Sequence, residues 1–159
     1  MCSDNISKVE ENRGDNKKMT EIEKDFTIQN YLEFLQNKKL MGSKCKDCGT
    51  LYAPVRKLCT KCNTSNMEWV ELSGEGELAA FTSITVGTPY FIQKGYDRNK
   101  PYCFSIIKLK EGPMVSAQLV GVDESKPETI HIGMPVRVKF LETELKGETK
   151  IDLGFSAIN

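Results

Sequence analysis

Four cysteines arranged as two C-x-x-C pairs are the residues of this sequence best suited to chemistry. Cys45 and Cys48 form the first pair, and Cys59 and Cys62 form the second pair after ten intervening residues. Each pair can present two thiolates from a tight turn, and four thiolates close a tetrahedron around one metal ion at about 2.3 Å. Because a closed tetrahedron leaves no ligand position for water, the spacing predicts a structural metal rather than a catalytic one.

The residue that follows each pair supports a metal site. Gly49 and Asn63 occupy these positions, and they are the residue types that best tolerate the positive φ angle often needed there. Zinc and iron both accept four sulfurs. We favour zinc because zinc ribbons commonly have this spacing and no redox-partner signature accompanies it. A thioredoxin-like redox pair is disfavoured because no βαβ pattern surrounds either C-x-x-C.

A metal would also solve a stability problem in this part of the chain. The segment 39–69 is too short to form a stable apolar core alone. Metal binding contributes on the order of 10 kcal/mol or more to the folding of such a segment. We therefore expect the four-cysteine unit to hold a shape.

A second candidate site is the aromatic and basic stretch "YFIQKGYDRNKPY". Its candidate ligand or partner contacts are Tyr90, Phe91, Lys94, Tyr96, Arg98 and Lys100. Aromatic and basic residues at the mouth of a barrel can bind a nucleotide, a phosphorylated small molecule, single-stranded nucleic acid or a protein edge. An ordinary exposed loop with solvated charges is equally compatible with this stretch.

The sequence offers no catalytic constellation. His131 is the one histidine, and we interpret it as a solvent-facing or hydrogen-bonded loop residue. Cys103 lies in an apolar run and is most simply a buried small hydrophobe. No G-x-S-x-G elbow or glycine-rich phosphate loop is present. The sequence therefore predicts a protein that is not an enzyme.

The element before the first cysteine is expected to be an amphipathic helix over 27–40. Thr27 can cap this helix, and Lys38 and Lys39 would lie in its last turn, with Gly42 just beyond. Its apolar stripe would consist of Ile28, Tyr31 or Leu32, and Leu35. This stripe must be buried on the chain's own core or on a partner.

From Trp69 onward the hydrophobic pattern has the period of two that is typical of strands. Leu78, Ala80, Ile84 and Val86 are expected on one face of the first strand. The runs "MPVRVKFLETELKG" and "TKIDLGFSAI" also alternate. Five such runs predict a mainly β fold with a five-stranded antiparallel OB-fold barrel. We divide the chain into a disordered tail (1–18), an N-terminal helical segment (19–42), a zinc ribbon (43–69) and the OB-fold (70–159).

The composition limits the classes of partner and compartment. The chain has 22 basic and 22 acidic residues, with 39% hydrophobic and 28% charged residues, as in soluble globular proteins. A balanced charge disfavours the alternative of a single-stranded nucleic-acid binder. There is no apolar run of membrane-spanning length and no signal-peptide pattern. We therefore expect no membrane partner and a reducing cytoplasmic location.

The order of helix, cysteine unit and barrel resembles one family, the rubredoxin-like zinc ribbon plus OB-fold proteins known as domain of unknown function thirty-five. The resemblance covers about 28–158. It is carried by the runs "KLMGSKCKDCGTLYAPVRKLCTKC", "MEWVELSGEGELAAFTSITVG" and "PETIHIGMPVRVKF". Ala53 departs from the family pattern, in which a second proline is usual, and we attach no functional meaning to this difference.

The resemblance implies a function that composition does not. Family members associate with acyl-CoA enzymes of the thiolase superfamily. It implies a non-catalytic scaffold that bridges acetoacetyl-CoA thiolase and HMG-CoA synthase in the mevalonate pathway, with structural zinc, a hetero-oligomeric state and a possible contact with CoA or acyl-CoA. The alternatives are a single-stranded nucleic-acid binder and a stand-alone acyl-CoA-binding enzyme such as a thioesterase or hydratase.

Overall fold

The computed structural model describes residues 24–145 and 147–158, and the fold is mainly β. The expected tail over 1–18 lies outside the described residues. The helices are α1 (Ile28–Gln36) and α2 (Pro89–Gln93), and the strands are β1 (Met41–Cys45), β2 (Leu51–Tyr52), β3 (Met67–Glu71), β4 (Glu75–Ile84), β5 (Tyr102–Leu109), β6 (Met114–Val120), β7 (Pro135–Leu145) and β8 (Glu148–Ala157). Neither helix of the described ranges is long and apolar enough to cross a membrane.

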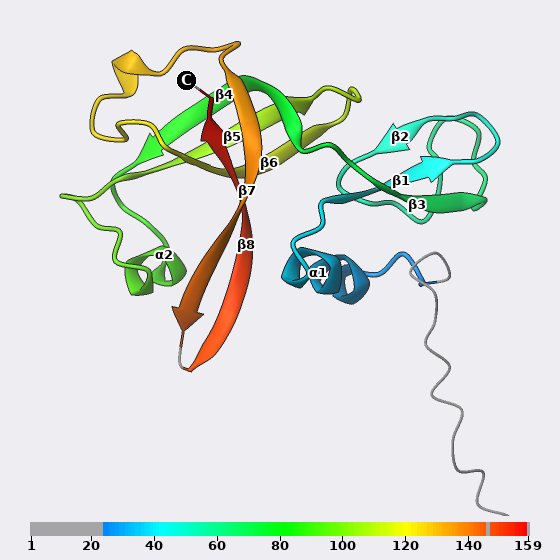
Figure 1. The fold of residues 1–159 in the computed structure, drawn as a ribbon, viewed down its shortest axis with the longest axis horizontal. Helices are drawn as coiled ribbons and strands as arrows, with labels where there is room; N and C mark the ends of the chain where they lie inside the picture. Colours follow the sequence, from blue (N-terminus) through cyan, green and yellow to red (C-terminus); the bar gives the residue numbers. More distant parts are fainter. Residues whose placement is uncertain (1–23, 146, 159) are drawn as a thin grey trace, which may run out of the picture.

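The chain forms a small sheet and a closed barrel that lie side by side (Figure 1). The small sheet has the order β2-β1-β3, and the barrel has the order β4-β5-β6-β8-β7. The long β7–β8 hairpin extends beyond the barrel, and α1 contacts both β8 and β1. The helix therefore bridges the two units.

The barrel has the five expected strands, but it is mixed rather than entirely antiparallel. β6 and β8 pair in parallel, while the other neighbouring strands in the barrel pair antiparallel. The cause is the long connection over 121–134, which carries the chain across the barrel from β6 to β7. β8 then returns antiparallel to β7 and reaches β6 in the same direction as β6.

The prediction that Leu78, Ala80, Ile84 and Val86 share one face of β4 is wrong after Leu78. A β-bulge shifts the register between Leu78 and Ala80, and the extra residue exchanges the two faces of the strand. Leu78 is buried, Ala80 is exposed and Phe81 packs against the barrel core instead. Val86 lies beyond the strand and is 70% exposed.

The helix α1 begins where the sequence predicted but ends earlier. Thr27 is its N-cap, and the Thr27 Oγ1 accepts a hydrogen bond from the Asn30 N–H at 3.3 Å. The helix ends at Gln36, and Lys38 takes a positive φ of 57°. Lys38 and Lys39 therefore lie outside the last turn, and Gly42 lies inside β1 rather than at a helix cap.

The buried stripe of α1 also differs from the expected one. Phe34 and Leu35 are the buried residues of the helix. Ile28 is 66% exposed and Leu32 is 48% exposed. Phe34 determines this rotation because its ring packs against Trp69 of β3, with ring centroids 4.9 Å apart. The helix thus docks on the chain's own small sheet and leaves two apolar residues outside.

The long connections contain short helices that the sequence analysis treated as loops. α2 lies between β4 and β5, and its first residue is Pro89, a favourable start for a helix. A 3-10 helix over Pro127–Thr129 lies between β6 and β7. The α2 segment covers the outer side of β5, where it positions most of the aromatic and basic candidates.

Candidate metal centre and loop site

The four cysteine sulfurs lie together at one end of the small sheet. All four Sγ atoms are within 4.8 Å of one another, and the Cys45–Cys62 and Cys48–Cys59 pairs are 3.6 and 3.5 Å apart. Four ligands about 2.3 Å from one ion in a tetrahedron would be roughly 3.8 Å apart. The donor set therefore fits one metal ion with a closed four-sulfur shell.

Two similar turns present these sulfurs. The Gly49 N–H donates to the Cys45 carbonyl and the Asn63 N–H donates to the Cys59 carbonyl, both at 2.9 Å. Gly49 has a φ of 72° and Asn63 has a φ of 57°. The expected left-handed conformation is confirmed at both positions. The backbone of each turn therefore positions its two thiols so that all four sulfurs converge, and this geometry is set within the turns rather than by a large apolar core.

The sulfurs are unequal in acidity because their surroundings differ. The Tyr52 hydroxyl beside Cys59 lowers the pKa of this thiol to about 6. Burial, together with the neighbouring thiols, raises the pKa of Cys62 to about 12. Four adjacent thiols resist simultaneous ionisation because the thiolates repel one another. A bound divalent cation would offset this repulsion. Because the four sulfurs would fill its coordination shell, the site is of the structural rather than the catalytic type.

Tyr52 supports the metal centre from outside the four ligands. Its oxygen lies 3.2 Å from the Cys59 Sγ and accepts a hydrogen bond from the Thr60 N–H at 3.1 Å. The hydroxyl therefore connects the first sheet hairpin to the second cysteine turn. Sequence reasoning missed Tyr52 because its residue type is common in strands and its contact with Cys59 depends on the folded ribbon.

We expect the substitution Tyr52→Phe to weaken zinc binding by about tenfold, the lower end of the effect typical of groups that bond to metal ligands. The reason is the loss of the hydroxyl that stabilises the Cys59 thiolate. Competition with a calibrated chelator measures the affinity. Tyr31→Phe is the matched control, because Tyr31 packs beside Phe34 and Trp69, away from the sulfurs. Equal zinc affinity of Tyr52→Phe and the parent protein would show that the Tyr52 hydroxyl does not support the metal centre.

The aromatic residues of the second candidate site pack mainly against one another. The Phe91 ring stacks on the Tyr102 ring with centroids 3.9 Å apart and an interplanar angle of 7°. The Tyr96 hydroxyl accepts a hydrogen bond from Gln118 Nε2 at 2.7 Å. Tyr102 and Gln118 are both buried under this cover. These rings therefore cap the outer side of β5 and β6.

Tyr90 and Lys94 converge on one carboxylate, Asp152 of β8. The Lys94 Nζ lies 2.9 Å from the Asp152 Oδ2, and the Tyr90 hydroxyl donates to the same oxygen. Burial and the Asp152 carboxylate raise the pKa of Tyr90 to about 12. The Lys94 side chain is only 7% exposed. Asp152 was not among the sequence candidates because strand periodicity marks it only as an outward polar residue.

The six loop candidates do not gather in one cavity. Lys94 and Tyr96 line an open cavity of about 430 Å³ against β7, and Arg98 lines a separate one of similar size near Glu124. Lys100 is exposed, with its Nζ 5.3 Å from the centre of the Tyr96 ring. Arg98 and Lys100 are thus the cations of this loop that face solvent. Their contact with a ligand or partner stays a prediction.

The two residues considered for catalysis occupy unrelated places. His131 lies on the exposed connection before β7. Cys103 is fully buried in the barrel core, where burial raises the pKa of its thiol. The interpretation of Cys103 as a buried small hydrophobe is confirmed.

Comparison with protein families matches two adjacent models to the chain. Residues 33–68 match the ChsH2 rubredoxin-like zinc ribbon domain, and residues 69–141 match the ChsH2 C-terminal OB-fold domain. The boundary between the models falls within β3, between Glu68 and Trp69. The two matches together span the metal centre and most of the barrel.

Individual relatives point in the same direction. A DUF35 domain-containing scaffold protein of Methanocaldococcus jannaschii is 34% identical over 110 residues, which cover 69% of this chain and 72% of that protein. The benzoylsuccinyl-CoA thiolase subunit BbsA of Geobacter metallireducens is 37% identical over 52% of this chain and 51% of its own length. Among solved structures, the Ltp2-ChsH2(DUF35) aldolase aligns with a TM-score of 0.65 and 26% identity, covering 80% of this chain and 91% of the matched chain.

Proposed function

Because the chain belongs to the DUF35 family of scaffold proteins, which join a rubredoxin-like zinc ribbon to an OB-fold, we propose that it is a non-catalytic subunit of an enzyme complex of acyl-CoA metabolism. Relatives named as a thiolase subunit and as part of an aldolase support this class of partner. The observation that carries the proposal is the closed set of four sulfurs. A metal with four protein ligands supports a shape and leaves no position for a substrate.

We propose more specifically that the partners are acetoacetyl-CoA thiolase and HMG-CoA synthase, in the cytoplasm. The thiolase condensation is uphill, so withdrawal of acetoacetyl-CoA by the synthase pulls it forward. A scaffold that holds both enzymes shortens the path of this intermediate. In this proposal the protein makes the first steps of the mevalonate pathway more efficient without acting on the substrate itself.

Two exposed apolar residues of α1 are proposed as a docking surface for the enzyme partner. Ile28 and Leu32 are one helical turn apart and lie on the same side of the helix. Adjacent exposed apolar side chains are a feature of protein interaction sites. The exposed cations Arg98 and Lys100 are the proposed contacts for CoA or acyl-CoA, because a CoA phosphate is an anion. We assign structural zinc to the four cysteines.

Co-expression with both enzymes tests the proposed function. We expect the protein to co-elute with thiolase and synthase in gel filtration and to carry about one zinc ion per chain, as a single four-sulfur site requires. A protein that elutes alone in the presence of both enzymes and instead retains single-stranded DNA at physiological salt would overturn the scaffold function in favour of nucleic-acid binding.

The double substitution Ile28→Asp and Leu32→Asp is expected to weaken association with the enzymes by at least about tenfold, or about 1.4 kcal/mol. Charged side chains would have to be desolvated at a surface that is now apolar. Isothermal titration calorimetry measures the change. Val86→Asp is the control, because Val86 is also an exposed apolar residue but lies outside α1, between the end of β4 and the start of α2. An unchanged affinity of the double variant would place the docking surface elsewhere.

A further inference from the structure

The segment that joins the small sheet to the barrel is only three residues long, 72–74, and each of them is held in place. Leu72 is buried in the barrel core, and its N–H donates to the Leu40 carbonyl at 2.9 Å. Leu40 immediately precedes β1. The chain is therefore tied together at the point where it enters the small sheet and the point where it leaves it.

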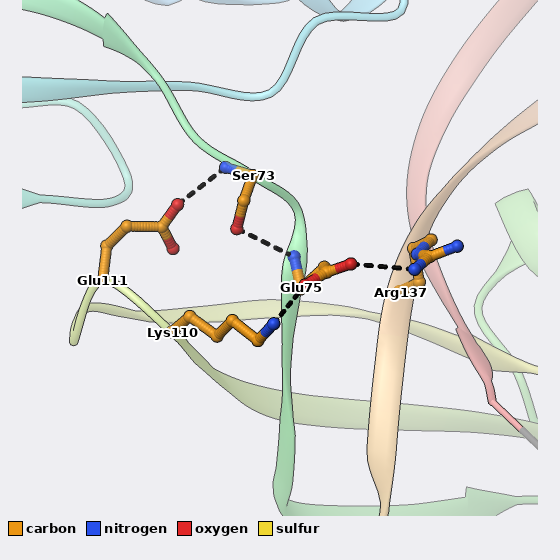
Figure 2. Close-up of polar contacts among 5 residues, drawn as sticks. All are labelled: Ser73, Glu75, Lys110, Glu111 and Arg137. Atoms are coloured by element: carbon orange, nitrogen blue, oxygen red, sulfur yellow. Dashed lines mark hydrogen bonds and ion pairs between the residues drawn. The ribbon is translucent and has the colours of Figure 1, made fainter.

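The next residue, Ser73, is bound from the turn between β5 and β6. The Ser73 N–H donates to Glu111 Oε1 at 2.7 Å, and the Ser73 Oγ accepts a hydrogen bond from the Glu75 N–H at 3.3 Å. Figure 2 shows the Glu111 carboxylate pointing toward the backbone nitrogen of Ser73 in the joining segment. The Glu111 side chain of the barrel thus accepts a hydrogen bond from the Ser73 N–H and restrains the joining segment.

The glycine at the end of the segment has little freedom. Gly74 has a φ of 70°, and a Cβ atom added there would lie 2.3 Å from a methyl carbon of Val138. Its carbonyl accepts a hydrogen bond from the Val138 N–H at 2.7 Å. A glycine between two units usually permits motion, but here β7 packs directly against it.

Glu75, the first residue of β4, binds two basic side chains from different parts of the barrel. Its Oε1 lies 2.8 Å from an Arg137 guanidinium nitrogen, and its Oε2 pairs with the Lys110 Nζ (Figure 2). The Lys110 N–H also donates to the Glu75 carbonyl at 2.9 Å. Glu75 therefore fixes the residue that directly follows the joining segment to the β5–β6 turn and to β7 at the same time.

We propose that residues 73–75, Lys110, Glu111 and Arg137 form a rigid joint that fixes the direction in which the zinc ribbon projects from the barrel. In this joint Glu75 and Glu111 are positioning residues. Apolar contacts of Leu51, Ala53 and Val70 with the barrel core hold the base of the ribbon against the barrel, and they permit sliding because they have no direction. The hydrogen bonds and ion pairs are directional, and they select one orientation.

The joint can be tested without any partner, so its failure would leave the scaffold function untouched. Spin labels are attached to unnatural amino acids at two exposed positions, Lys57 in the ribbon and Glu128 in the 3-10 helix between the barrel strands β6 and β7. Pulsed electron paramagnetic resonance measures the distance distribution between the labels in the zinc-loaded full chain. We expect a narrow distribution for the parent protein. The distance distribution of the Glu75→Gln variant is expected to be about twofold broader, because motion between the ribbon and the barrel, the usual behaviour of two joined units, would be restored.

Glu77→Gln is the matched control because Glu77 lies on the same strand and pairs with Lys108 at 3.3 Å, outside the joint. It removes the same charge and should leave the distribution narrow. Glu111→Ala tests the second carboxylate and decides the outcome if Glu75→Gln does not fold. Zinc content and circular dichroism verify that both units remain folded. The proposal of a rigid joint would be overturned if the distance distributions of Glu75→Gln and Glu111→Ala were as narrow as that of Glu77→Gln.

Discussion

Replacement of Cys59 by serine is expected to abolish metal binding and unfold the zinc ribbon while the barrel remains folded. Cys59 is fully buried between Cys48, Cys62 and Tyr52. A metal site of this kind contributes on the order of 10 kcal/mol or more to folding. The ribbon around the sulfurs has only a small apolar cluster of its own, in which Met67 is the one buried residue besides Cys45 and Cys59 among the described residues. It cannot replace that contribution.

Tryptophan fluorescence provides a direct measurement of this effect. Trp69 is the only tryptophan of the sequence and is buried in the ribbon sheet, so its emission should shift to longer wavelength when the ribbon unfolds. Metal analysis of the purified parent protein separates zinc from iron. Cys103→Ala is the control, because Cys103 lies in the barrel core, away from the four sulfurs. A Cys59→Ser protein that keeps both its metal and its parent emission would contradict the structural role.

Replacement of Trp69 by alanine is expected to reduce the free energy of unfolding by about 3–5 kcal/mol, the typical loss for a buried large aromatic residue. The Trp69 ring stacks on Phe26 with centroids 4.7 Å apart and also packs against Phe34 of α1. Its Nε1–H donates to the Lys24 carbonyl at 2.7 Å. Loss of this ring removes the surface on which α1 docks, so helical content should fall as well.

Trp69→Phe separates packing from the hydrogen bond. It retains a ring against Phe26 and Phe34 but cannot donate to the Lys24 carbonyl, so we expect a loss of only about 1 kcal/mol. Urea denaturation measured by circular dichroism gives both values. A Trp69→Ala variant as stable as Trp69→Phe would indicate that α1 is held by contacts other than this aromatic cluster.

The parts of the fold that could be predicted depend on local rules. The two cysteine turns require a positive φ at fixed positions, and Gly49 and Asn63 meet this need within the turn itself. The strand β7 alternates because one face packs on the core and the other faces water, as with buried Val136 and exposed Arg137, whereas β8 buries the neighbouring residues Gly154 and Phe155 and does not alternate. Such signals are present in a short window of sequence and do not depend on distant contacts.

The errors arose where a distant residue decides the local structure. Phe34 faces inward because Trp69 lies opposite it, 35 positions later in the chain, and helical periodicity alone allowed the other stripe. The bulge in β4 is a one-residue change of register set by pairing with β5. The same reason hid Asp152, because its partners Tyr90 and Lys94 lie in and just after α2, 62 and 58 positions earlier in the chain. The parallel β6–β8 pair is likewise a property of the whole topology.

The position of β8 in the barrel also has a consequence for biosynthesis. β8 is the last strand of the described chain, yet it lies between β6 and β7 and pairs with both. On the ribosome, the segment that forms the ribbon is complete well before β8 emerges, since translation adds roughly 5–20 residues per second. The ribbon can therefore acquire its metal while the barrel strands still lack their closing partner. During this interval the unpaired side of β6 is exposed to aggregation, and early release of the nascent chain would leave a metal-loaded ribbon attached to an open sheet.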